Sequence, residues 1–229
     1  MIIGMFSDLH SNLPALESMV EKFGSKIDIW LSAGDSVGIF PQVNETLNLL
    51  QRMNVHMVCG DHEKLLLSGE DMVWSYTGNQ ALQEQRESIT KENLYYLSSL
   101  PEKLDLKIDG LNIRLIHDVT GVIRTGKEKN IINSQQLNIL HPGVDYLLAG
   151  HTHMATMLYT DTLIYLNPGS SGFPKDLRHQ TGMLMLDTSS GFHEFITFDF
   201  DRDRLRKAII DKNYNPKLLH YLDNNFRWI

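Results

Sequence analysis

Cysteine is almost absent from the sequence, with Cys59 as the only one among 229 residues. A disulfide within the chain is therefore excluded, which is typical of a protein from the reducing cytoplasm. No stretch approaches the roughly 20 apolar residues that a membrane span needs. The apolar start, Met1 to Phe6, has no basic region and no small-residue cleavage site, so it resembles a first buried strand rather than a signal peptide. We expect a cytoplasmic protein that does not act on a membrane.

Runs of basic residues are also missing, and the formal net charge is -7. Nucleic-acid affinity comes mostly from Lys and Arg side chains that neutralise phosphates, so bulk DNA or RNA is disfavoured as a partner. No Gly/Ser-rich or Pro-rich linker and no internal repeat divides the chain. Hydrophobic residues make up 42% of it, enough for a sizeable core. We predict a single domain over residues 1–229, of unknown oligomeric state.

The first sixty residues alternate between apolar runs and helical patterns. The runs are Met1–Phe6, Ile27–Leu31 and Val55–Val58. Between them, residues 13–23 and 42–52 place apolar side chains at helical spacing, with Asn12 as the N-cap of the first helix. This βαβαβ order predicts parallel strands covered by helices, and such sheets bind ligands at the carboxyl ends of their strands.

Residues 63–100 have a helical pattern, and we predict a helical insertion beside the strand-end face. Its aromatic residues suit the core of the insertion, or alternatively a wall for a nucleotide base; they are Trp74, Tyr76, Tyr95 and Tyr96. The second half is richer in β pattern. We predict hairpins around Asp109-Gly110 and Thr160-Asp161, strands at 146–149, 182–187 and 192–198, a helix at 134–140, a turn at Asn167-Pro168-Gly169-Ser170, and polar helices after Asp201.

Five short clusters of Asp and His residues follow predicted strands. They are Asp8-Leu9-His10, Gly34-Asp35, Gly60-Asp61-His62, His117 and Gly150-His151-Thr152-His153. Residues two apart in an extended segment point to the same side, so Asp8 and His10 are expected to face one point, as are His151 and His153. The glycines allow tight turns and close backbone approach. Mixed imidazole and carboxylate ligands suit zinc, manganese, iron or nickel rather than calcium.

These clusters hold more ligands than one ion needs. The seven candidate metal ligands are Asp8, His10, Asp35, Asp61, His117, His151 and His153. Two ions about 3.5–4 Å apart, bridged by one carboxylate, would use all of them. Such a pair clamps the oxygens of a phosphate and activates a bridging hydroxide as the nucleophile. The sequence therefore predicts hydrolysis of a phosphate ester.

In this order, the motifs resemble those of the calcineurin-like metallophosphoesterase superfamily, and within it the compact bacterial and archaeal phosphodiesterase-type members. The likeness rests on D-L-H-x-N, G-D, G-D-H-E, a lone His after an apolar run, G-H-T-H and N-P-G-S, and it spans residues 8 to about 170. Gly172-Phe173-Pro174-Lys175-Asp176 also looks like that branch. The resemblance implies an α/β fold, a four-layer αββα sandwich of two mixed β-sheets flanked by helices.

The resemblance also implies a role for each residue. Asp8, His10 and His153 would hold the first metal ion, Asp61, His117 and His151 the second, and Asp35 would bridge them. His62 would protonate the leaving group or contact the phosphate, and Asn12 would lie near the phosphate. Asp35 and His62 are thus the expected catalytic residues, with Asn12, Asp61 and His62 as substrate contacts. Manganese is the first expectation for both ions, with iron, zinc and nickel as alternatives.

One position departs from the family pattern, which usually has G-N-H-[DE] where this chain has Gly60-Asp61-His62-Glu63. Aspartate still binds metal, but it cannot donate an amide N–H to a phosphate. Two divalent ions with Asp8 and Asp35 carry roughly +2, Asp61 lowers this to roughly +1, and a hydroxide takes it to neutral, which weakens the pull on an anionic substrate. The site then either works more slowly or with another metal, prefers a less charged substrate, or has been altered; we favour the first reading.

The sequence differs from the family pattern after His117, and from the protein Ser/Thr phosphatase pattern after Gly34. Asp118 stands where the family often has Gly after His117, and suits either a partner for a ligand histidine or a solvated loop residue. The run Gly34-Asp35-Ser36-Val37-Gly38 lacks the G-D-x-x-D-R-G form of protein Ser/Thr phosphatases, which argues against a phosphoprotein substrate.

The remaining candidates have ordinary interpretations. Five histidines show no partner at ligand spacing and are expected to be structural or exposed: His56, His141, His179, His193 and His220. Cys59 lies in an apolar run, so we expect it to be buried and inert.

The sequence thus predicts a metal-dependent enzyme that hydrolyses a small phosphate ester, of the phosphodiester or nucleotide type. The rival hypothesis is a non-catalytic metal-binding scaffold of the same fold, weakened at Asp61. Scaffolds usually lose histidine ligands, and all four are present here, so the rival ranks second.

Overall fold

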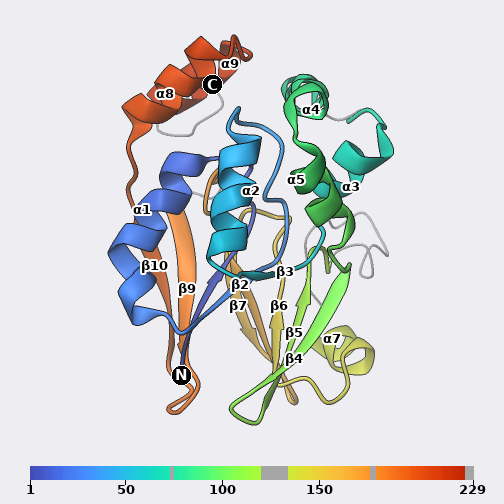
Figure 1. Ribbon diagram of the computed structural model, residues 1–229. Helices are drawn as coiled ribbons and strands as arrows, with labels where there is room; N and C mark the ends of the chain where they lie inside the picture. The colour runs from blue at the N-terminus through green and yellow to red at the C-terminus, as the bar shows by residue number, and fades with distance from the viewer. Residues whose placement is uncertain (73–74, 120–133, 176–178, 225–229) are drawn as a thin grey trace.

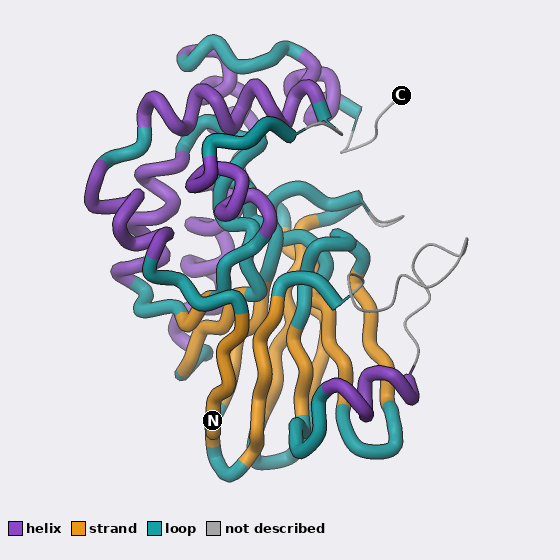
Figure 2. The backbone as a smooth tube through the Cα atoms, turned by 90° about the vertical axis from the view of Figure 1, so that its right-hand side faces the viewer, coloured by secondary structure: helices purple, strands orange, loops and turns teal. Residues whose placement is uncertain are grey.

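The computed structural model describes residues 1–72, 75–119, 134–175 and 179–224. Its strands form two five-stranded sheets that pack against each other (Figures 1 and 2). The first sheet has the order β10 (His193–Phe198), β9 (Thr181–Asp187), β1 (Ile2–Phe6), β2 (Ile29–Ser32) and β3 (His56–Met57). The second has the order β4 (Lys103–Ile108), β5 (Leu111–Ile116), β6 (Tyr146–Leu148), β8 (Ile164–Pro168) and β7 (Ala155–Tyr159).

Both sheets are mixed. In the first, β1 pairs in parallel with β2, and β2 with β3, through the crossover helices α1 (Leu13–Phe23) and α2 (Val43–Arg52). The hairpin of β9 and β10 joins antiparallel to β1. In the second, β5, β6 and β8 are parallel, while β4 and β7 are antiparallel edge strands. The predicted βαβαβ order and the two mixed sheets are confirmed.

Three hydrophobic clusters fill the spaces between four layers, because strand side chains alternate between the two faces of a sheet. On β1, Ile3 and Met5 face the second sheet, whereas Phe6 faces the helices. On β6, Leu148 joins the cluster between the sheets, whereas Leu147 packs beneath α7 (Ser134–Leu140). Figure 2 shows the layers edge on, with α7 on the side away from the larger group of helices. The predicted αββα sandwich is confirmed.

Helices also gather at one end of the sandwich. The N-terminus lies at the lower end of Figure 1, so β1 runs upward, and α4 (Tyr76–Ser88), α8 (Arg202–Asp211) and α9 (Lys217–Asp223) lie at the upper end. With α3 (Asp61–Ser68) and α5 (Lys91–Ser98), α4 makes up the predicted helical insertion. That the chain folds as one domain stays a prediction. Within the described ranges, no helix has the length and apolar character needed to cross a membrane.

Two local predictions were wrong. Asn167 and Pro168 are the last residues of β8, so the turn begins only at Gly169, whose φ is +78°. The preferred core placement fails for Tyr76 and Tyr95, which are each 78% exposed. Tyr96 does pack partly against the core, and Trp74 lies outside the described residues.

Candidate metal centre

Six of the seven candidate ligands lie on loops that follow the carboxyl ends of strands, and Asp61 is the first residue of α3, directly after the loop that follows β3. Three loops follow β1, β2 and β3 in the first sheet, and two follow β5 and β6 in the second. Backbone bonds join the loops within each sheet: the Asp8 N–H donates to Gly34 O at 3.0 Å, and the Gly150 N–H donates to His117 O at 2.9 Å. Between the sheets, the His151 N–H donates to the Asp8 carboxylate, at 3.1 Å from Oδ2. The packing of the sheets thus brings both sets of loops to one edge.

The backbone at five of these ligands is left-handed, with φ between +52° and +67°: Asp8, His10, Asp35, His151 and His153. The extended geometry expected for the two Asp-x-His and His-x-His pairs was therefore wrong, although the members of each pair do lie close together. Non-glycine residues in this region cost of order 1–3 kcal/mol each and persist where the surroundings hold them. Such strain, concentrated on the polar loops, is typical of a functional site.

Asp8, His10 and His153 form the first group, with ligand atoms all within 4.8 Å of one another. The His153 Nε2 lies 3.3 Å from Asp8 Oδ1 and 3.1 Å from the His10 Nε2. The His10 Nδ1 donates to Val37 O at 3.2 Å, and the His153 Nδ1 donates to Phe173 O at 2.5 Å. These carbonyls fix the tautomer of each ring, so both Nε2 lone pairs point into the group.

Two facing lone pairs repel unless a cation or a shared proton lies between them. Burial, together with neighbouring positive charge, lowers the pKa of both His10 and His153 well below the usual value, so a shared proton is disfavoured near neutral pH. A carboxylate with two neutral imidazoles is the donor set that zinc, manganese or iron prefers. The residues of the first group therefore fit a metal ion.

Asp61, His117 and His151 form the second group, again with ligand atoms within 4.8 Å of one another. Asp61 Oδ2 lies 3.1 Å from the His151 Nδ1. The His117 Nδ1 donates to Ala33 O at 2.7 Å, which leaves its Nε2 as the candidate ligand atom, 3.3 Å from Asp35 Oδ2. Two imidazoles with a carboxylate are a donor set that zinc, manganese or iron prefers. The second group also fits a metal ion.

Asp35 lies between the two groups. Its Oδ2 is 3.3 Å from the His117 Nε2, and it also clusters with Asp8 on one side and with His10 and His62 on another. Burial acts to raise the pKa of Asp35, but His117 and His62 outweigh it and hold that pKa well below its usual value. Burial likewise acts to lower the pKa of His117, and Asp35 reverses this and raises it. Asp35 is thus an ionised carboxylate that lies between the two groups.

His62 and Asn12 have different surroundings. The ring of His62 packs against that of His10, with centroids 4.4 Å apart, and its Nε2 is 4.0 Å from Asp35 Oδ2. Its ring also lies so close to Gly38 that a Cβ there would be 2.0 Å from the Nδ1. Asn12 is fully buried, its Oδ1 accepts from the Ala15 N–H and its Nδ2 donates to Gly172 O. It is the predicted N-cap, and its contact with a substrate stays a prediction.

Glu63 is the main residue that sequence reasoning missed. It is fully buried at the third position of α3, where Oε2 accepts from the Gly60 and Asp35 N–H groups at 2.8 and 2.9 Å. Oε1 accepts from the Ser36 N–H and hydroxyl and from the Val37 N–H. One carboxylate therefore holds the loops that carry Asp35 and Asp61. The capping-box spacing of Gly60-x-x-Glu63 was the available signal.

Gln85 and Ser170, which are distant from these loops in the sequence, also form hydrogen bonds to them. From α4, the Gln85 side chain accepts from the Gly38 N–H at 2.8 Å and donates to Phe40 O at 2.7 Å. The Ser170 hydroxyl donates to Asp8 O at 2.6 Å. Nothing local in the sequence marks either contact, since their partners are 47 and 162 residues away.

The glycines before the ligands behave as predicted. Gly34 has a φ of +96°, and a Cβ there would lie 2.8 Å from the Gly60 nitrogen. A Cβ at Gly60 would lie 2.3 Å from Asp35 Oδ1. Larger residues at these positions would push the two ligand loops apart.

Residues set aside in the sequence lie largely as expected. Cys59 is buried, and burial raises the pKa of its thiol to about 12, so it is inert near neutral pH. His141 contacts Arg114, whereas His193 contacts the Tyr159 hydroxyl. Asp118 lies 3.9 Å from the His151 Nε2, which favours its reading as a partner of a ligand histidine.

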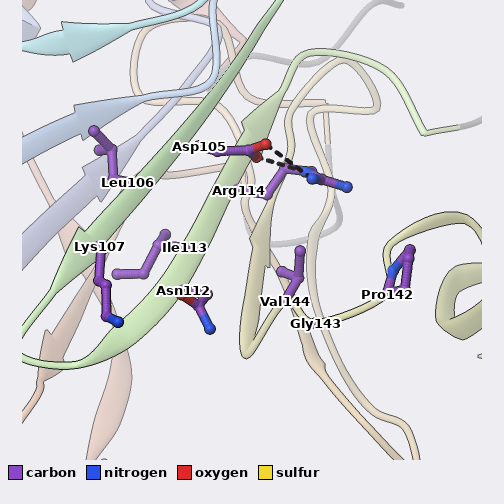
Figure 3. A pocket seen from close by; sticks show the side chains of 9 residues that line it. All are labelled: Asp105, Leu106, Lys107, Asn112, Ile113, Arg114, Pro142, Gly143 and Val144. Carbon is purple, nitrogen blue, oxygen red and sulfur yellow. Dashed lines mark hydrogen bonds and ion pairs between the residues drawn. The ribbon is translucent and has the colours of Figure 1, made fainter.

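Two pockets differ in their relation to this centre. One, of about 260 Å³, is bordered by His62. The other, of about 250 Å³, lies along β4 and β5, and its lining in the described chain includes no candidate ligand (Figure 3). There Arg114 is paired with Asp105 at 2.6 Å, so its charge is already neutralised. Of these two pockets, only the one bordered by His62 lies next to the candidate centre, because the His62 ring packs against that of His10.

Comparison with known proteins agrees with the geometry. Over 95% of both chains, this sequence is 26% identical to an uncharacterised protein of Methanocaldococcus jannaschii. It is also 26% identical to serine/threonine-protein phosphatase 2 of Escherichia coli strain K12, over 73% of this chain and 87% of that one.

Two solved structures share the fold. A metallophosphoesterase from Sphaerobacter thermophilus has a TM-score of 0.77 at 21% identity, covering 98% of this chain and 100% of its own. A hypothetical protein from Pyrococcus horikoshii OT3 has a TM-score of 0.82 at 20% identity, covering 96% and 97%. Residues 1–191 match the calcineurin-like phosphoesterase superfamily domain. The chain belongs to the calcineurin-like phosphoesterase superfamily.

Proposed function

We propose that the protein hydrolyses small phosphate esters at two metal ions, of which manganese is the first candidate. The observation that carries this proposal is the place of Asp35, whose carboxylate lies within 4.8 Å of ligand atoms of both Asp8 and His117. Two groups of ligands that share one carboxylate suit two ions rather than one. The ions would supply Lewis acidity, which offsets phosphate charge and makes water acidic enough to attack at neutral pH.

The side chains of the protein orient this reaction. Backbone carbonyls fix the rings of His10, His117 and His153, and Glu63 fixes the loops of Asp35 and Asp61. Their preorganisation removes the cost of arranging the ligands during turnover. Overall, the oxygen of water forms a bond to phosphorus, the bond from phosphorus to the leaving oxygen breaks, and that oxygen takes up a proton.

His62 is the side chain best placed to contact the ester. It borders both Asp35 and the 260 Å³ pocket, and its buried Nδ1 has no hydrogen-bond partner in the described residues. An N–H of this ring has two proposed uses: it protonates the leaving oxygen, or it donates to a phosphate oxygen. Loss of turnover in His62→Ala with unchanged metal content would support either use over a purely structural one.

A non-catalytic scaffold is the second candidate, and Asp61 is the feature that favours it. Its carboxylate lies in the second group, where it lowers the positive charge available to a substrate. Against this, all four histidine ligands are present, their rings are held in the ligating tautomer or beside carboxylates, and a pocket borders His62. We therefore rank hydrolysis first.

The decisive experiment uses full-length protein stripped with a chelator and then given manganese, nickel, zinc, iron or magnesium. Bis-p-nitrophenyl phosphate and p-nitrophenyl phosphate test diester and monoester hydrolysis, and bound metal is counted in parallel. Turnover that returns with metal supports the enzyme. Two ions bound per chain without turnover on either ester would favour the scaffold.

A further inference from the structure

The pocket beside His62 contains a lysine, Lys175, to which the proposed chemistry gives no role. Among the residues that the structure describes, eight line this pocket, and they come from the insertion, the metal loops and the C-terminal helices: Ile39, His62, Met72, Ser75, Thr77, Phe173, Lys175 and Leu218. No acidic side chain is among them. Lys175 supplies the only ammonium group among these described residues, and its Nζ lies 5.3 Å from the centre of the Phe173 ring.

Lys175 lies near the candidate metal centre, because the Phe173 ring that it contacts packs against the rings of His10 and His153, with centroids 5.9 Å apart in both cases. It is exposed to solvent, yet surrounding protein atoms desolvate its ammonium group and lower its pKa, and the Asp8 and Asp35 carboxylates act in the opposite direction. Lys175 lines the pocket, and its ammonium group feels the same two carboxylates that the metal ions would neutralise.

We propose that Lys175 and this pocket form the subsite that recognises the substrate, with Lys175 binding a phosphate oxygen and the pocket holding a small leaving group. This inference rests on the proposed function. A lysine binds phosphate as a point charge. The Asp61 carboxylate lowers the net positive charge at the second group of ligands by one. The Lys175 ammonium group adds one positive charge beside the first group, so the electrostatic attraction for an anionic ester is maintained.

The size and lining of the pocket limit which leaving groups can fit in it. Its volume of about 260 Å³ is below the roughly 300–1,000 Å³ typical of ligand sites, so it suits one ring or one sugar rather than a peptide or a second nucleoside. Met72, Phe173 and Leu218 offer apolar contact, whereas Ser75 and Thr77 offer hydroxyl groups. A single ring with polar substituents, carried on a phosphate, matches this lining.

The test of Lys175 compares Lys175→Met, Lys175→Arg and the control Lys26→Met in metal-loaded, full-length protein. Lys26 is an exposed lysine that lies just before β2, at the opposite end of the sheet from the centre. We measure KM and kcat for p-nitrophenyl phosphate, the Kd of inorganic phosphate by calorimetry, and metal content. Lys175→Met should raise both KM and the phosphate Kd by roughly 10-fold or more with metal content unchanged, as expected when a charge-assisted hydrogen bond is lost. Lys175→Arg should retain much of the binding, and Lys26→Met should match the parent.

The test of the pocket uses Thr77→Phe, which fills it, and Glu87→Phe on the exposed face of the same helix as the control. Thr77→Phe should raise KM for p-nitrophenyl phosphate but leave the Kd of inorganic phosphate unchanged, because phosphate has no leaving group. Equal effects of the two variants would overturn the assignment of the pocket.

The outcomes separate this inference from the proposed function. If the parent protein turns over esters but Lys175→Met changes neither KM nor the phosphate Kd, the subsite is wrong and the function stands. Loss of metal from Lys175→Met would also overturn the subsite, since the lysine would then act through the ligands. If the parent shows no turnover, yet binds phosphate through Lys175, the subsite stands and the proposed function fails.

Discussion

The Nε2 atoms of His10 and His153 lie 3.1 Å apart, on rings whose Nδ1 atoms both donate to backbone carbonyls. Their lone pairs face each other in a fully buried group, an arrangement that a bound cation stabilises. The Nε2 atoms of both rings are therefore placed as donors to a cation. Four predictions follow from this and from the neighbouring contacts.

Replacing His153 by Ala should remove one ion per chain and lower kcat/KM by at least about 100-fold, since partners of metal ligands alone are worth about 10- to 100-fold. Metal analysis and hydrolysis of p-nitrophenyl phosphate check both effects. His56→Ala, at an exposed histidine, is the control. Full metal content in His153→Ala would contradict the assignment of this ligand.

Replacing Asp61 by Asn should raise kcat/KM by roughly 10-fold. The change removes one negative charge from the second group of ligands and adds an amide N–H that a phosphate oxygen can accept. The exposed Asp71→Asn serves as the control. If Asp61→Asn instead loses metal and activity together, the view of Asp61 as a feature that merely weakens the site fails.

Replacing Glu63 by Ala should destabilise the protein by about 3–5 kcal/mol, because five hydrogen-bond donors at the metal loops lose one buried acceptor carboxylate. For a chain of this size, that corresponds to a fall in Tm of about 10 °C. Thermal unfolding of the metal-free protein measures it, with the exposed Glu70→Ala as control. Metal affinity should fall as well. A Tm within about 2 °C of the parent would show that the loops hold their shape without Glu63.

Metal affinity should rise with pH and level off above about pH 7. Burial raises the pKa of Asp8 to about 7, so in the metal-free protein this ligand holds a proton in mildly acidic solution. A cation must displace that proton, and so affinity falls as the pH drops below 7.

The raised pKa of Asp8 also makes the stability of the metal-free fold depend on pH. Because the folded pKa of Asp8 lies above the unfolded value of 3.8, its protonation stabilises the metal-free fold fully below about pH 4, and this contribution is lost as the pH rises to 7.

Calorimetry in buffers of different ionisation enthalpy should detect proton release on manganese binding at pH 6 and less at pH 8. Equal affinity and equal proton release at both pH values would contradict the role of Asp8 as a ligand.

Much of the fold could be predicted because its signals are local. Alternating apolar runs and helical patterns in the first sixty residues gave the order of β1, α1, β2, α2 and β3, and Asp109-Gly110 marked the hairpin of β4 and β5. The prediction of a turn at Asn167-Pro168 was wrong, because both residues still pair in β8 and the turn starts at Gly169, two residues later than predicted. The prediction that Tyr76 and Tyr95 lie in the core was wrong for another reason. Aromatic residues are often buried, but the face of a helix that is covered depends on segments distant in the sequence.

The sequence by itself determined which residues have the chemistry of a metal site, since Asp and His recur just after strands that periodicity identifies. Only the tertiary structure decided how they meet. Packing of two sheets brings loops from both to one edge, left-handed backbone rather than extended geometry turns the paired ligands inward, and Glu63 fixes the loops through donors on separate segments. The surroundings of Lys175 were likewise decided by folding, because the Asp8 and Asp35 carboxylates that act on it are more than a hundred residues away in the sequence. Local patterns arise from neighbours in the chain, whereas charge, burial and strain at a site depend on groups that only folding brings together.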